Sequence, residues 1–249
     1  MKSAGDKNFL SGGGEMERLI REMDWSKTAL GPIASWPQSL RTSIRIALDC
    51  AFPIVIWWGP ELVILYNDEY KMIIGPAKHP FALGERGRKV WAEIWDVIGP
   101  MLSQVMERGE ATRSRDLMLH VDRGYPEEAY FSFSYSPIYD ETGKVAGIFC
   151  PVIETTEKII GERRLRTLRD LAARCKGAES EQAVFESASE VLAANLHDVP
   201  FAMIYSLDES EAVARLDATS GIAPGPGASP IVPLGESVGT WSLSAVAQS

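Results

Sequence analysis

The sequence predicts an α+β fold, and three observations lead to that class. Two apolar runs, Phe52–Trp58 and Leu62–Tyr66, flank a Gly-Pro turn and have the length and residue content of hairpin strands. Apolar residues return at helical spacing after residue 89, and three strand-like segments follow. Two strands, helices and then three strands predict a five-stranded antiparallel sheet with helices on one face.

The three later strands are predicted from alternation and turn residues. Thr112–Val121 has apolar residues at every second position near its end, and Tyr130–Pro137 alternates aromatic residues with serines. A turn with Asp and Gly separates the latter from Lys144–Ile153. After the first hairpin, Asn67 or Asp68 is expected to cap a short helix, because either side chain can accept an amide of the first turn.

The helices are predicted from apolar spacing and from their ends. Residues 36–51 have apolar side chains at every third or fourth position, and Ser35 is expected to cap this helix. The helical pattern after residue 89 contains Pro100, which predicts a kink or a second helix because proline has no amide hydrogen. Gly109 is expected to close that helical region.

A connecting helix and a second unit are predicted beyond the sheet. Residues 154–174 contain no proline and many helix formers. Leu165 and Leu168, followed by Ala172 and Cys175, fit either a short coiled-coil seam or packing on the helix's own domain, and both interpretations stay open. A helix over 181–196 and two strands between 200 and 219 follow, too few elements for a comfortable core, so we expect an incomplete domain.

Composition and charge limit the function classes. The chain of 249 residues is 45% hydrophobic and 24% charged, which is typical of a globular protein, and its net charge of -9 disfavours nucleic acid as a partner. The three cysteines form no CxxC pair, so neither a zinc site nor a disulfide framework is predicted. No stretch is long and apolar enough for a signal peptide or membrane helix, and we expect a cytoplasmic protein without a membrane partner.

Four segments together resemble a PAS domain of the kind found at the front of bacterial sensor histidine kinases: DWSKTALGPIASWPQSLR, FPIVIWWGPELVILYNDEY, EIWDVIGPMLSQVMERGEAT and FSFSYSPIYDETGKVAGIFCPVIETTE. Glu154-Thr155-Thr156-Glu157 is similar to the Asp-Ile-Thr-Glu signature at the junction with the signalling helix, with Glu in place of Asp. The segment from RRLRTLRDL to FAMIYSL resembles the opening of a GAF domain. The expected organisation is a flexible N-terminus with a short helix (1–30), a PAS domain (31–155), a signalling helix (156–176) and an incomplete GAF domain (177–249).

This resemblance implies the signal-input module of a two-component signalling protein, relaying a detected signal through the linker helix. The family's phospho-acceptor histidine and ATP site have no counterpart in the 249 residues, so the kinase activity of a parent protein stays open. The alternative from another class is a ligand-free PAS scaffold that dimerises. As partners we expect a second copy, bound through the helix 36–51 and the linker helix, and a small molecule in the PAS cavity.

No cofactor is predicted. His79, His120 and His197 stand in no recognisable motif, and a single histidine beside a proline is weak support for haem. Flavin photochemistry of the light-sensing PAS type would need a reactive cysteine in a helix, and Cys50 and Cys150 lie outside such an element. Haem, flavin and a metal site are therefore all disfavoured, and no catalytic group is assigned.

Two sets of candidate functional residues remain. The first is aromatic and aliphatic and forms either the core between sheet and helices or, in part, the wall of a cavity for a planar or aliphatic metabolite: Ile56, Tyr66, Trp91, Trp95, Leu119, Phe131, Phe133 and Tyr135. The second is Glu154 with Thr156, where a carboxylate and a hydroxyl can cap the linker helix and tie it to the sheet. Ordinary capping and signal transfer both fit that pair.

Overall fold

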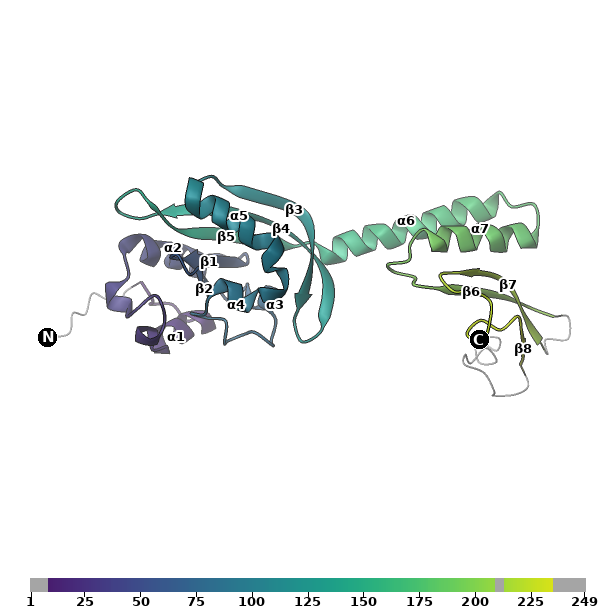
Figure 1. The fold of residues 1–249 in the computed structure, drawn as a ribbon, viewed down its shortest axis with the longest axis horizontal. Helices are drawn as coiled ribbons and strands as arrows, with labels where there is room; N and C mark the ends of the chain where they lie inside the picture. The colour runs from purple at the N-terminus through teal and green to yellow at the C-terminus, as the bar shows by residue number, and fades with distance from the viewer. Residues whose placement is uncertain (1–8, 209–212, 235–249) are drawn as a thin grey trace. The chain divides into compact units, whose positions relative to one another are not determined.

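The computed structural model describes residues 9–208 and 213–234. The chain divides into two compact units, 1–159 and 160–249. The first unit contains a five-stranded antiparallel sheet in the order β2-β1-β5-β4-β3, shown in Figure 1. Its strands are β1 (Ile54–Trp58), β2 (Val63–Tyr66), β3 (Thr112–Asp122), β4 (Pro126–Tyr139) and β5 (Val145–Glu154). The predicted α+β sheet is confirmed, and the long-range pairing of β1 with β5 closes its centre.

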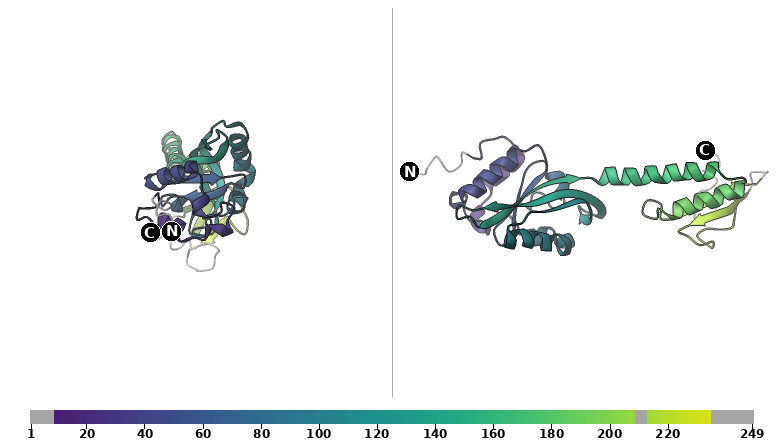
Figure 2. Two further views of the ribbon diagram at one scale, coloured as in Figure 1. Left: turned by 90° about the vertical axis from the view of Figure 1, so that its left-hand side faces the viewer. Right: turned by 90° about the horizontal axis from the view of Figure 1, so that it is seen from above.

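Helices cover both faces of this sheet, so the expectation of helices on one face is wrong. In the right-hand view of Figure 2, α1 (Glu15–Glu22) and α2 (Gln38–Asp49) lie on one side of the sheet and α5 (Trp95–Arg108) on the other. Ile73 of α3 (Lys71–Ile74) and Trp91, which follows α4 (Gly87–Val90), line a cavity together with Ile98 of α5. Every residue of β1 and β2 is buried. A short, continuously apolar strand is typical of burial on both faces, and the runs IVIWW and VILY contain that signal.

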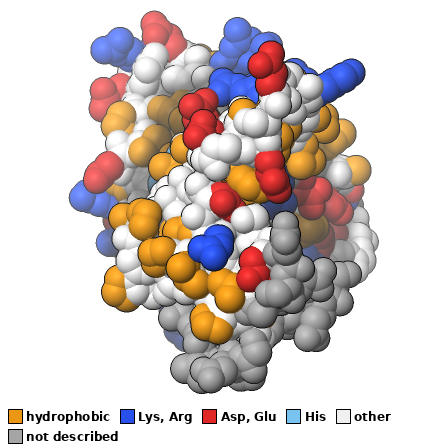
Figure 3. Space-filling view, turned by 90° about the vertical axis from the view of Figure 1, so that its right-hand side faces the viewer, with side chains coloured by type: hydrophobic (Ala, Val, Ile, Leu, Met, Phe, Trp, Pro, Cys, Tyr) orange, Lys and Arg blue, Asp and Glu red, His pale blue; other side chains and the backbone are white. Residues whose placement is uncertain are grey.

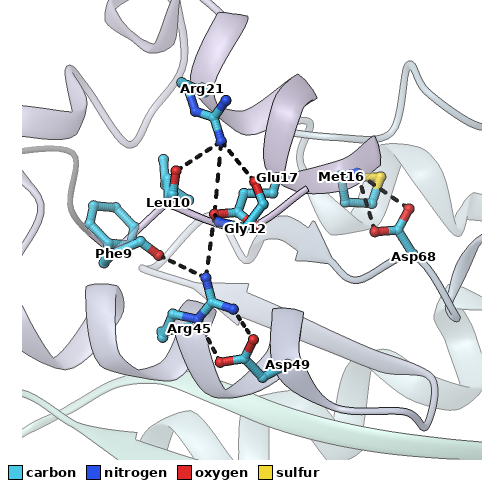
Figure 4. A network of polar contacts seen from close by, with 9 residues as sticks. All are labelled: Phe9, Leu10, Gly12, Met16, Glu17, Arg21, Arg45, Asp49 and Asp68. Carbon is cyan, nitrogen blue, oxygen red and sulfur yellow. Dashed lines mark hydrogen bonds and ion pairs between the residues drawn. The ribbon is translucent and has the colours of Figure 1, made fainter. Parts of the chain in front are cut away.

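The segment before α2 belongs to the core of the first unit rather than forming a loose extension. Leu10, Met16, Ile20 and Trp25 are all nearly or completely buried. Polar contacts fix the same segment, as Figure 4 shows for the residues around α1. The carboxylate of Glu17, 3% exposed, accepts from the amide of Gly12 and pairs with the guanidinium of Arg45 on α2.

The expected caps differ in detail from those observed. The hydroxyl of Ser35 donates to the carbonyl of Pro32 (2.7 Å), and α2 begins at Gln38 without a side-chain cap. α5 runs through Pro100 as one helix that begins at Trp95, so no second helix starts at the proline. The prediction for Gly109 is confirmed, because it ends α5 in the left-handed region with a φ of 68°.

Asn67 and Asp68 have separate structural roles after β2. The Oδ1 atom of Asn67 accepts from the amides of Ile54 (2.9 Å) and Tyr70 (3.1 Å), and its Nδ2 atom donates to two carbonyls of the chain entering β1. Asn67 therefore fastens the turn before α3 to the start of β1. Asp68 caps another helix, since its carboxylate accepts from the amide of Met16 in α1 (3.3 Å).

The second unit consists of a helix pair and a three-stranded sheet. α6 (Thr156–Lys176) begins in the first unit, and α7 (Glu181–Ala193) follows it. The sheet has the order β6-β7-β8, from β6 (Ala202–Leu207), β7 (Val213–Ser220) and β8 (Ile231–Pro233). The sequence did not predict β8. The side chain of Ser180 caps the start of α7 by accepting from the amide of Ala183.

Few side chains of the second unit are buried. Its buried apolar residues within 160–208 and 213–234 are Val191, Ala214 and Ala228. Figure 3, in which this unit faces the viewer, shows hydrophobic side chains exposed among charged ones. The GAF identity of this unit and its expected incompleteness both remain predictions. In the part of the chain that the structure describes, no helix is long and apolar enough to span a bilayer.

Candidate functional site

A small cavity lies between the sheet and the helices α3–α5. Its volume is about 40 Å³, and its walls are aromatic and aliphatic side chains with no charged group among them. Five of the eight predicted residues line it, namely Trp91, Leu119, Phe131, Phe133 and Tyr135. Alternation along β4 explains the last three, because residues two apart on a strand project to the same face. The sequence did not identify Val55, Trp57, Tyr70 or Cys150, which also line the cavity.

Three predicted residues lie elsewhere. Ile56 alternates with Val55 and Trp57 on β1, so it projects to the α2 face of the sheet. Tyr66 pairs with Val55 across β1 and β2 but does not line the cavity, and its hydroxyl lies 3.0 Å from Nδ1 of His79. Trp95 packs behind the wall, with its ring centroid 6.5 Å from that of Trp57. Helical spacing relative to Trp91 was therefore a poor guide, because α4 ends before α5 begins at Trp95.

The size of the cavity separates the two interpretations of the aromatic set. Pockets for metabolites usually enclose about 300–1,000 Å³, whereas this one is about 40 Å³. Since one water needs roughly 10–15 Å³ by a comparable measure, the space holds about three waters. The aromatic set is therefore mainly core in this conformation, and a larger metabolite would require side chains to move.

The polar groups at the cavity wall are neutral at physiological pH. Burial raises the pKa of the Tyr70 and Tyr135 hydroxyls well above their ordinary range, and it does the same to the pKa of the Cys150 thiol. The indole Nε1 atoms of Trp57 and Trp91 are buried and have no hydrogen-bond partner among the residues described. The cavity thus combines apolar walls with uncharged donors. No histidine lines it, and no cluster of metal-binding side chains occurs within residues 9–208 and 213–234.

The predicted junction residues Glu154 and Thr156 are in direct contact. The hydroxyl of Thr156 donates to Oε1 of Glu154 (2.8 Å) and accepts from the amide of Tyr130 on β4 (2.9 Å). The amide of Thr155 donates to the carbonyl of Tyr130 (2.7 Å). These bonds tie the end of β5 and the start of α6 to the neighbouring strand.

Arg123, in the β3–β4 hairpin, joins this junction to the cavity wall, and sequence analysis missed it. Its Nη2 donates to Oε2 of Glu154 (2.8 Å), and its Nε donates to the carbonyl of Ile73 (3.0 Å), a residue of α3 that lines the cavity. The guanidinium also pairs with Glu127 at 2.9 Å. Arg123 is 16% exposed and Glu154 28%, so solvent screens this pair less than a surface ion pair. The available signal was an Arg-Gly step between two predicted strands.

Comparisons with known proteins add a likeness of fold. No protein-family profile and no curated protein matches the chain. Among solved structures, an RNA-binding Light-Oxygen-Voltage receptor is 20% identical with a TM-score of 0.40, covering 61% of this chain and 43% of its own. The PAS domain of BvgS from Bordetella pertussis is 20% identical with a TM-score of 0.38, covering 52% and 96%.

A sensory box sensor histidine kinase from Vibrio cholerae is 15% identical with a TM-score of 0.33, covering 46% of this chain and 89% of its own. The present chain spans less than half the length of the Light-Oxygen-Voltage receptor. At these TM-scores the neighbours carry no functional argument. The PAS-like character of the first unit rests on its own five-stranded antiparallel sheet and the helices packed on it.

Proposed function

We propose that the chain is the sensory input region of a two-component signalling protein, in which a change at the PAS-like cavity is relayed to α6. The observation that carries this proposal is the position of Arg123. One side chain holds the cavity-lining helix α3 through the carbonyl of Ile73 and the start of α6 through Glu154. A shift of α3 would therefore strain or release the same guanidinium that holds the junction.

The junction has the properties of a two-state element. The hydroxyl of Thr156 donates a hydrogen bond to Glu154, and the Glu154 carboxylate also accepts hydrogen bonds from two nitrogens of Arg123. If Arg123 follows α3, the Glu154 carboxylate loses its guanidinium partner, and its hydrogen bond from Thr156 at the start of α6 is free to rearrange. A histidine kinase as recipient of the signal belongs to the same proposal, and the resemblance of the sequence supports it.

The test changes the junction and measures the cavity, because coupling between two sites is reciprocal. Thr156→Val removes the hydroxyl that joins Glu154 to the amide of Tyr130. Indole N–H resonances of Trp57 and Trp91 are expected to shift in the variant. Thr167→Val is the matched control on the same helix, since its hydroxyl contacts Asn195 in the second unit. Unchanged indole resonances in a folded Thr156→Val protein would refute the relay.

A second candidate, the dimerisation scaffold, is favoured by the exposed leucines of α6. Leu165 and Leu168 are 67% and 63% exposed, on the side of the helix away from Arg163, which binds Asp198. Parallel pairing on this stripe would place Arg164 near the partner's Arg169, at flanking positions where opposite charges favour association. The like charges and the short stripe predict weak self-association. Light scattering of the chain, with Leu168→Lys as control, tests whether such a dimer forms.

A further inference from the structure

Two tryptophans that line the cavity, Trp57 and Trp91, have a buried indole N–H without a hydrogen-bond partner in the described part of the chain. The hydroxyl of Tyr70 interacts with the side chain of Trp91, which leaves Trp57 as the donor with no neighbour of this kind. The indole Nε1 of Trp57 has no hydrogen-bond partner in the described part of the chain, although Trp57 is 1% exposed. Buried polar groups are almost always paired, so each exception requires an explanation. Because Trp57 lines the cavity, an acceptor bound inside that space would satisfy this donor.

The surroundings of the cavity offer nothing to balance a charged ligand. The two nearby cations are Lys78, 4.1 Å from the centroid of the Trp91 ring, and Arg123, 5.7 Å from the centroid of Phe131. Lys78 pairs with Glu93, and Arg123 pairs with Glu127 and Glu154. Neither cation lines the cavity, and both are neutralised by carboxylates. An anion would lose its hydration without gaining a counter-charge, which is strongly unfavourable.

Besides the indole N–H groups of Trp57 and Trp91, the polar groups at the wall are the hydroxyls of Tyr70 and Tyr135 and the thiol of Cys150. Burial raises the pKa of each group, so all three stay uncharged at neutral pH. They can donate to a neutral ligand without changing their protonation state. A volume of about 40 Å³ admits roughly three separate waters, or about four covalently bonded heavy atoms, because bonded atoms lie closer together.

We propose that the cavity binds a small uncharged molecule of about four heavy atoms whose hydrogen-bond acceptor receives the Trp57 indole N–H. This inference rests on the sensory function proposed above and specifies the chemical class of its ligand. A neutral carbonyl compound with a short apolar body has this chemistry. Carboxylates and phosphates are excluded by charge, and aromatic metabolites are excluded by size in this conformation. For four heavy atoms the dissociation constant is no tighter than about 4 × 10⁻⁵ M.

The experiment uses three probes of matched shape: acetone, which is neutral with an acceptor; acetate, which is charged; and 2-methylpropene, which has no strong acceptor. Each is titrated into the full chain while the tryptophan indole N–H resonances are recorded. Acetone is expected to move the Trp57 resonance in a saturable manner, with at least 10-fold weaker effects from the other two. The Trp36 resonance is an internal control, since its indole donates to the carbonyl of Gly31 (3.0 Å) on another part of the core.

Two variants keep the result interpretable. Trp57→Phe removes the donor and retains an aromatic ring. Acetone binding to this variant is monitored by the resonances of other residues at the cavity, and its affinity is expected to fall at least 10-fold. Trp58→Phe is the matched control, because the next residue of β1 projects to the opposite face and acetone binding should persist. An unchanged Trp36 resonance reports that each variant is folded.

Three outcomes would overturn the proposal. Equal binding of acetate would contradict the exclusion of charge, and equal binding of 2-methylpropene would remove the role of the acceptor. No saturable binding of any probe would mean that water or nothing occupies the cavity. None of these results affects the coupling between Thr156 and the cavity, so the ligand class can fail while the relay stands.

Discussion

Replacing Arg123 by Met should destabilise the first unit and separate α3 from the junction. The substitution removes hydrogen bonds to the carbonyl of Ile73 and to both carboxylate oxygens of Glu154. Hydrogen bonds to charged groups contribute about 1.5–3 kcal/mol each, and partial exposure of Glu154 lets water replace part of that loss. We expect the free energy of unfolding to fall by about 2–4 kcal/mol, a large share of the roughly 5–15 kcal/mol of a typical domain.

A double-mutant cycle isolates the contact between Arg123 and Glu154. Glu154→Gln keeps the size of the side chain and removes its charge, and the coupling energy with Arg123→Met should be about 1–2 kcal/mol. Urea unfolding followed by tryptophan fluorescence reports mainly on the first unit, because six of the seven tryptophans lie between residues 25 and 95. Additive single effects, within about 0.5 kcal/mol, would refute the reasoning that these two side chains act together.

Two further predictions concern other polar contacts. Asn67→Ala should lower the unfolding free energy by about 2–4 kcal/mol in the same urea assay, because it leaves the buried amide of Ile54 without its acceptor; an effect below 1 kcal/mol would contradict this role. In the second unit, the bidentate hydrogen bonds from Arg163 lower the pKa of Asp198 to about 2 from 3.8. Because the pKa of Asp198 is lower in the folded than in the unfolded protein, its ionised carboxylate stabilises the fold above pH 4. About 1–2 kcal/mol of the unfolding free energy should therefore be lost as the pH falls from 4 to 2. Amide exchange of β7 measures this loss, and Asp198→Asn should abolish that pH dependence.

The sequence predicted the sheet well because its strands have distinct local patterns. Serines alternate with aromatic residues over 130–137, and that period places Phe131, Phe133 and Tyr135 on one face. Ile56 was misassigned because β1 is apolar throughout, so the pattern itself contains no information on which face each residue takes. A continuous apolar run is typical of a strand buried on both faces.

The polar contacts could not be predicted to the same degree. Glu154 and Thr156 were found through a local motif, whereas Arg123 lies 31 residues away in sequence from Glu154 and meets it through the pairing of β4 with β5. The docking of α1 likewise depends on Asp68 and Arg45, both distant in sequence. Pairings of this kind follow from tertiary structure, and local propensity does not specify them. The size of the cavity depends on side-chain packing and was equally inaccessible.

The most direct test of the central claim fills the cavity and measures the start of α6. Leu119→Phe adds volume at a wall residue, and Ala47→Val does so under α2 on the other face of the sheet as a control. We expect Leu119→Phe to change hydrogen exchange of amides 157–162 and Ala47→Val to leave it unchanged. Arg123→Met should abolish the response to Leu119→Phe. An equal response to Leu119→Phe with and without Arg123 would contradict a relay through this side chain.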